Sequence, residues 1–198
     1  MESIQKYFKN SRDKKIVDNY MNFVGKDEVL SIMSRYDKKI FAGRWEQVLT
    51  SLSTNILGSG VFYSSVNSSY ILQKDGSVRV INKAINSFFQ EVELEGVSFA
   101  RNELIPICRS VKFDNCNFEG NYWIIYISRD QNTIIICAPL ILFGTFDLLN
   151  NFGLYVMTRD RFKFWNSEEP QKVFEILGKY GFNKFWNSPI DSGTSFFI

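Results

Sequence analysis

The sequence contains no histidine among its 198 residues. Catalysis by Ser-His-Asp or Cys-His groups is therefore excluded, and so are zinc and haem sites that need a histidine ligand. A switch that responds to pH near neutrality would have to use another titratable group. No catalytic constellation or metal site is recognisable, so we predict neither an enzyme nor a bound cofactor.

Cysteine, excess charge and long apolar runs are also scarce. The three cysteines, Cys108, Cys116 and Cys137, lack metal-ligand spacing and are odd in number, which indicates free thiols. Residues 1–24 are too rich in Lys, Asp and Asn for a signal peptide, and no apolar run is long enough to span a bilayer. We therefore expect a soluble, cytoplasmic or intracellular protein, unless a leader has been removed.

Two further features of the composition concern partners and source. The 23 basic and 21 acidic residues leave a net charge of +2, so we expect no nucleic-acid partner. The abundance of Asn, Lys, Ile and Phe hints at an AT-rich genome, such as that of a large DNA virus or an intracellular microbe.

The chain does contain a series of short apolar and aromatic strand patterns. Aromatic residues make up 16% of the sequence, and an all-β protein accommodates them well. Asp75-Gly76 marks a hairpin turn. A helix is predicted at Glu169–Tyr180, with Pro170 in its first turn and Gly181 as a stop. The predicted strands are Arg44–Leu52, Tyr63–Gln73, Val78–Lys83, Phe89–Phe99, Glu103–Phe113, Tyr122–Ser128, Thr133–Ala138 and Phe152–Thr158.

Residues 1–34 carry helical patterns instead. They predict two short helices separated around Asn10-Ser11, and Asp27 as the cap of a further turn. One interpretation is a basic amphipathic segment for a membrane surface, but acidic residues dilute its charge. We favour the other interpretation, a helix packed on the outside of the strand-rich region that follows or on a second copy of the chain.

The stretch from Tyr36 to Trp45 combines a helical turn, a tight bend and a bulky anchor. Asp37 is suited to cap a turn that leads into Phe41, and Gly43 permits the bend. Trp45 then begins a strand with a ring that has to be buried. The spacing Asp37…Phe41-x-Gly43-x-Trp45 resembles the first signature of the lipocalin family.

Other segments resemble lipocalins in the same order along the chain. Ser68–Asn82 is similar to the second and third strands of bacterial-type and apolipoprotein-D-like lipocalins. Tyr122–Asp130 resembles the second signature, although only Asp130 of its Thr-Asp-Tyr is present. Leu154–Arg159 resembles the last barrel strand, and Glu168–Asp191 resembles the C-terminal helix with a short strand after it. The long segment between Ile136 and Gly153 departs from the family pattern.

The resemblance implies an all-β fold, an eight-stranded antiparallel up-and-down β-barrel with a C-terminal α-helix packed on its wall. A helical extension at 1–34 would precede the barrel and helix at 35–191, and a short tail would follow at 192–198. Gly43, Trp45 and Arg159 are expected to form the barrel floor, because in lipocalins the matching arginine lies across the tryptophan.

The lipocalin register also implies which side chains face the interior, because side chains alternate across a strand. The resulting set is mainly apolar with a few hydroxyl and amide groups, which suits an amphipathic organic molecule. The implied function is binding or transport of a fatty acid, a lysophospholipid or a similar lipid. An interaction protein whose barrel is filled by its own side chains is the alternative. The expected ligand-binding residues are Gln47, Leu49, Val66, Ser68, Tyr70, Val78, Val80, Asn82, Ile124, Tyr126, Ile135, Cys137 and Tyr155.

Two further hypotheses concern the open end and one thiol. The loops expected at the open end are unusually apolar, and Leu140–Phe146 would suit a lid, contact with a membrane surface, or a partner surface such as that of a homodimer; the alternative is that it folds in as core. An enzyme that modifies a lipid or carotenoid on the same scaffold would use Cys137 as its nucleophile. A buried cysteine is more often a small core residue, which is the interpretation we favour.

Overall fold

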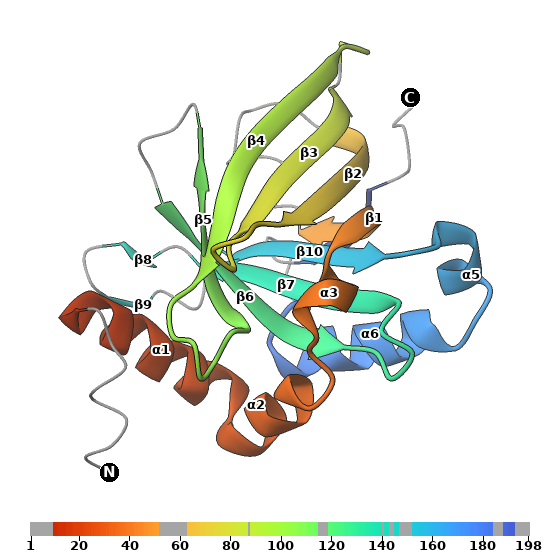
Figure 1. Cartoon of the computed structure of the whole chain (residues 1–198). Helices are drawn as coiled ribbons and strands as arrows, with labels where there is room; N and C mark the ends of the chain where they lie inside the picture. The colour runs from red at the N-terminus through yellow and green to blue at the C-terminus, as the bar shows by residue number, and fades with distance from the viewer. Residues whose placement is uncertain are drawn as a thin grey trace.

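The computed structural model describes residues 10–51, 63–86, 88–114, 119–139, 141–142, 145–146, 152–183 and 188–192. Eight antiparallel strands form a closed barrel (Figure 1). Strands that follow one another along the chain lie side by side, and the last one pairs with the first. The barrel strands are β1 (Gly43–Ser51), β2 (Tyr63–Leu72), β3 (Val78–Asn86), β4 (Glu91–Ala100), β5 (Cys108–Phe113), β6 (Glu119–Ile127), β7 (Thr133–Pro139) and β10 (Phe152–Thr158).

Most predicted strands agree with these bounds to within a few residues. The exception is β5, which begins at Cys108 instead of Glu103. The preceding residues form turns, in which the Asn102 side chain accepts a hydrogen bond from the Leu104 backbone N–H at 2.7 Å. Pro106 cannot donate a hydrogen bond to a neighbouring strand, so pairing starts only beyond it.

Three short strands complete the sheet structure. The connection between β7 and β10 contains a small hairpin of β8 (Ile141–Leu142) and β9 (Thr145–Phe146). After the last helix, β11 (Pro189–Asp191) pairs with Leu49–Ser51 of β1, whereas β2 pairs with β1 only over Gly43–Glu46. The predicted short strand near the C-terminus is thereby confirmed. It pairs with the part of β1 that β2 does not reach.

The helix boundaries that the sequence predicted are found to within one residue, except at one N-cap. The helices are α1 (Ser11–Val24), α2 (Lys26–Met33), α3 (Lys38–Phe41), α5 (Arg161–Trp165) and α6 (Glu169–Lys179). The predicted separation around Asn10-Ser11 agrees with the start of α1 at Ser11, where the Asn10 side chain caps the helix by accepting from the Asp13 backbone N–H at 2.9 Å. A further break lies at Gly25 (φ +91°), which takes the N-cap position that Asp27 was expected to provide. A helix before Asn10 falls outside the described residues.

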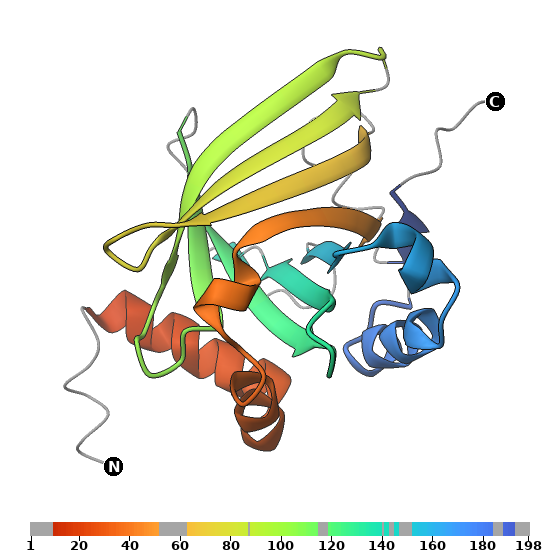
Figure 2. The same cartoon turned by 45° about the vertical axis from the view of Figure 1, so that its right-hand side comes forward.

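Helix α1 packs on the outer wall of the barrel, which confirms the interpretation favoured above. Its Tyr20 is fully buried, donates a hydrogen bond to the Ile124 carbonyl at 2.7 Å and meets the Trp123 ring edge-on at 5.4 Å between centroids. Figures 1 and 2 place α1 and α2 on one side of the β6–β7 hairpin and α5 and α6 on the other. None of the helices in the described part of the chain has the length and apolar character needed to cross a bilayer.

A buried ion pair joins α1 to the barrel. Arg101, just beyond β4, lies 2.7 Å from the Asp13 carboxylate, and the two side chains are only 7% and 5% exposed. The same guanidinium donates to Ser110 Oγ at 2.5 Å and pairs with Glu119. Because both charges are removed from water, this contact depends on each partner being present.

Candidate ligand-binding site

The inner face of the barrel is identified by a contact across it. The hydroxyls of Tyr70 on β2 and Tyr122 on β6 share a hydrogen bond, although these strands are not neighbours in the sheet. The bond therefore crosses the interior. Cross-strand partners lie on the same face of a sheet, so the pairing register assigns the other inward positions from these two tyrosines.

The register places many of the expected site residues on this inner face. Tyr70 pairs with Val80, Ser68 with Asn82, and Trp45 with Ser68. Ile124 and Tyr155 both pair with Ile136. Gln47 shares the face of Trp45, and its amide donates to Ser192 Oγ at 3.0 Å, while Val66 lies in an irregular stretch of β2. Contact of these residues with a ligand stays a prediction. The inner-face residues that were expected are Gln47, Ser68, Tyr70, Val78, Val80, Asn82, Ile124 and Tyr155.

Four expected positions are wrong: Leu49, Tyr126, Ile135 and Cys137 lie on the outer face. Cys137 pairs with Trp123, whose ring meets Tyr20 of α1 outside the barrel. Ile135 shares this face, pairing with Tyr126, whose hydroxyl donates to Glu169 of α6 at 2.9 Å. Leu49 pairs with Val156, which in turn pairs with Ile135.

Irregularities in two strands cause part of this error. The register of β1 shifts between Gln47 and Leu49, and that of β6 shifts between Ile124 and Tyr126. A β-bulge inserts one extra residue and so reverses the alternation beyond it. Inward positions beyond these bulges are one residue away from those expected, for example Thr50, which pairs with Tyr155, instead of Leu49.

The closed end has the expected arrangement of three residues. The Arg159 guanidinium lies 3.7 Å from the centroid of the Trp45 ring, and it donates to the carbonyls of Arg44 at 2.6 Å and Ala42 at 2.7 Å. Gly43 has φ +103°, and a Cβ there would come within 3.0 Å of Arg159 Nη1. The Trp45 indole donates to the Phe41 carbonyl at 2.9 Å, so the floor is tied to α3.

Arg109 is an inner-face residue that sequence reasoning missed. It pairs with Tyr122 and is completely buried. Its guanidinium donates to Ser98 Oγ and the Ser98 carbonyl, each at 2.9 Å, and to the Tyr36 hydroxyl and Pro106 carbonyl at 3.3 Å. Within the described residues no carboxylate pairs with it. The only signal in the sequence is an arginine next to Ser110 within a strand pattern, because Ser98 reaches it from the neighbouring strand, where it pairs with Val111.

The two ends of the inner face differ in exposure. Near the floor, Trp45, Tyr70 and Val80 are at most 2% exposed. Towards the open end, Leu94 pairs with Asn82 on the same face and is 41% exposed. Solvent therefore reaches this inner-face leucine, which lies in the part of β4 beyond its pairing with β5 over Gly96–Ala100.

The described cysteines are buried and unreactive. Cys108 and Cys137 are free thiols with no exposed surface. Burial raises the pKa of the Cys137 thiol well above its ordinary value, so the nucleophilic thiolate is disfavoured. Cys116 lies outside the described residues, and no cluster of metal ligands occurs within them.

Inward tyrosines make stability depend on alkaline pH. Burial raises the pKa of Tyr155 from 10.0 to about 12. Below pH 10 the phenol is protonated in both states, but between pH 10 and 12 the unfolded chain loses the proton first, so stability falls as pH rises. We expect this residue to account for about 2 kcal/mol of lost unfolding free energy by pH 11.5. Urea unfolding at pH 9 and 11.5 should show a smaller loss in Tyr155→Phe than in the parent; equal losses would contradict this.

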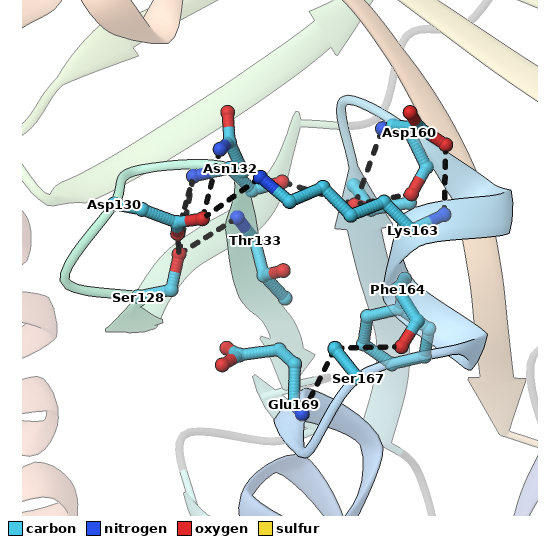
Figure 3. Close-up of polar contacts among 10 residues, drawn as sticks. Ser128, Asp130, Asn132, Thr133, Asp160, Lys163, Phe164, Ser167 and Glu169 are labelled. Atoms are coloured by element: carbon cyan, nitrogen blue, oxygen red, sulfur yellow. Dashed lines mark hydrogen bonds and ion pairs between the residues drawn. The ribbon is translucent and has the colours of Figure 1, made fainter.

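A second cleft, of about 660 Å³, lies outside the barrel between the β6–β7 turn, α5 and α6 (Figure 3). Its polar groups largely bond one another. Ser128 Oγ donates to Asp130 at 2.7 Å and accepts from the backbone N–H groups of Asn132 and Thr133 at 3.1 and 2.9 Å. The Lys163 ammonium lies 4.0 Å from Asp130. Most of these contacts lie within the β6–β7 turn, and the exposed Lys163–Asp130 pair joins the turn to α5.

A closed antiparallel barrel whose floor is sealed by a tryptophan and an arginine belongs to the calycin class of folds. The family model described as a lipocalin-like domain matches residues 36–141, more than half of the chain. The protein therefore belongs to the lipocalin family. Members of this family bind small hydrophobic molecules, which agrees with a binding protein and not an enzyme. Among curated proteins, none matches this sequence.

Solved structures share the fold at low sequence identity. Lobster apocrustacyanin A1 is 12% identical with a TM-score of 0.60, and the match covers 86% of each chain. Insecticyanin from the tobacco hornworm Manduca sexta is 11% identical with a TM-score of 0.57, covering 81% of this chain and 82% of that one. A major cockroach allergen, Per a 4, is 15% identical with a TM-score of 0.54, covering 81% and 89%.

Proposed function

We propose that this protein binds and transports a single-chain amphipathic lipid, such as a fatty acid or lysophospholipid, inside the barrel. The observation that carries the proposal is the gradient along the inner face. The floor around Trp45 is closed and buried, whereas Leu94 in the other half is apolar, inward and 41% exposed. Exposed apolar surface in a concave site is stabilised when a ligand covers it.

The two alternatives have less support. An enzyme that uses Cys137 would need an inward, ionised thiol, but this side chain shares the outer face with Trp123 and its pKa is raised by burial. A barrel filled by its own side chains agrees with the hydroxyl bond between Tyr70 and Tyr122 near the floor, but not with the exposure of Leu94.

A binding experiment with the neutral dye Nile red tests the proposal. The parent protein should enhance the dye's fluorescence, and organic extraction of freshly purified protein should release lipid that mass spectrometry detects. Leu94→Trp adds bulk to the inner face and should weaken dye binding at least about tenfold by occupying the cavity.

A matched control distinguishes dye binding inside the barrel from nonspecific dye binding to apolar residues on the outer surface. Ile71 is similarly exposed, at 48%, but pairs with Arg79 on the outer face. Ile71→Trp should leave the dye affinity unchanged. Equal weakening by both substitutions, or no dye binding and no extracted lipid from the parent, would refute a ligand in the barrel.

Three further proposals rest on the sequence. They are contact of Leu140–Phe146 with a membrane surface, formation of a homodimer, and an intracellular location without a nucleic-acid partner. Within Leu140–Phe146 the structure describes only the backbone of β8 and β9.

A further inference from the structure

Two hydroxyls on the inner face form no hydrogen bond with any residue that the structure describes. Thr50 on β1 and Tyr155 on β10 are cross-strand partners, so they point to the same side of the sheet. Thr50 is completely buried, and its Oγ1 forms no hydrogen bond within the described part of the chain. The Tyr155 hydroxyl likewise forms no hydrogen bond with the described residues. Tyr155 is only partly buried, whereas buried hydroxyls are nearly always bonded, so it is the unbonded Thr50 hydroxyl that requires an explanation.

The neighbouring polar groups of the inner face are already bonded. Ser68 donates to Asn82 Oδ1 at 2.7 Å, and Tyr70 and Tyr122 bond each other. The Gln47 amide donates to Ser192, as described above. The polar end of a ligand would therefore gain most from Thr50 and Tyr155, where no existing bond has to be broken.

The charge of the inner face favours an anion. Arg109 is buried there without a carboxylate partner, and the paired inner-face positions within the described residues include no acidic side chain. Arg109 pairs with Tyr122, which lies two residues before Ile124 on β6, and Ile124 and Tyr155 both pair with Ile136, so the arginine and the two hydroxyls share the inner face. A positive charge in a low-dielectric interior attracts an anionic group and opposes a cationic one.

We propose that Thr50 and Tyr155 donate hydrogen bonds to the head group of the bound lipid, and that this head group is a carboxylate drawn by the field of Arg109. This inference rests on the proposed function and narrows it to fatty acids. A lysophospholipid, whose head group is bulky and carries a cation, fits this arrangement poorly.

The test compares palmitate with hexadecanol, which has the same chain length but no charge. The parent should bind palmitate at least about tenfold more tightly in calorimetric titrations. Thr50→Val and Tyr155→Phe remove one hydroxyl each and keep the shape of the side chain. Each should weaken palmitate binding about five- to tenfold. Tyr126→Phe is the matched control, because the Tyr126 hydroxyl bonds Glu169 on the outer face, and it should leave palmitate binding unchanged.

A stability measurement separates a binding role from a structural one. If Thr50 Oγ1 is unbonded without ligand, Thr50→Val should leave the urea midpoint of the ligand-free protein unchanged or raise it. A lowered midpoint in Thr50→Val, or parent-like palmitate affinity in both variants, would refute the proposal that these hydroxyls donate hydrogen bonds to the head group. Equal affinities for palmitate and hexadecanol would refute the proposal that the head group is a carboxylate.

Nile red distinguishes this inference from the proposed function. If the parent binds the dye but not palmitate, the proposed ligand-binding barrel stands and only the head-group assignment is refuted. If the parent binds neither, both the proposed function and the head-group assignment are refuted.

Discussion

Asp13→Ala is expected to lower the free energy of unfolding by about 3–5 kcal/mol, because it leaves the Arg101 charge buried without its main partner. The two side chains lie 2.7 Å apart and are almost inaccessible to solvent. Urea unfolding followed by tryptophan fluorescence measures the effect. Trp123 is a suitable reporter, since its ring contacts Tyr20 of the same helix.

Two further variants test the cause of that loss. Asp18 is exposed on α1, and Asp18→Ala should change the unfolding free energy by no more than about 0.5 kcal/mol. Replacing both partners, in Asp13→Leu with Arg101→Met, should recover much of the stability, because neither of these two buried charges then remains and the Glu119 carboxylate, 24% exposed, is reached by water. A single Asp13→Ala variant as stable as the parent would show that the ion pair does not hold α1 to the wall.

Trp45→Ala is expected to cost about 3–5 kcal/mol of unfolding free energy, through the cavity left at the barrel floor. The ring is 1% exposed, and it contacts Arg159 above its face and α3 through the indole N–H. Arg159→Ala should also lower the melting temperature, since it removes the contact with the ring and uncovers carbonyls.

Ligand affinity distinguishes a structural floor from a binding residue. At a temperature where each protein is folded, Arg159→Ala should bind Nile red with the affinity of the parent. Its control is Arg44→Ala, an exposed arginine on the same strand as Trp45, which should keep the parent's melting temperature. Parent-like stability of Trp45→Ala would contradict the assigned role.

The sequence was informative wherever a local signal had one structural meaning. The spacing from Asp37 to Trp45 predicted the α3 turn, the bend at Gly43 and the floor, and the structure confirms each of them. Pro170 and the apolar spacing after it predicted α6 to within one residue at its C-terminus. These features depend on neighbouring residues and on no distant part of the chain.

Side-chain orientation was predictable only up to the first irregularity of a strand. The residue types from Gln47 to Leu49 do not predict the bulge that turns Leu49 outward. In β7 alternation itself fails, because Ile134, Ile135, Ile136 and Cys137 are all buried, some by the interior and others by the helices outside. A strand covered on both faces is apolar throughout, so its sequence does not indicate which of its side chains face the interior.

The pairing of β1 has a consequence for how the chain acquires its fold. This strand is joined to β10 on one side and, in its second half, to β11 on the other. During synthesis on the ribosome, β1 emerges long before either partner, so the barrel closes only after β10 and β11 have been made. Contacts between such distant segments form slowly. We therefore expect unpaired strands to persist during translation, a stage at which chaperones would protect the growing polypeptide.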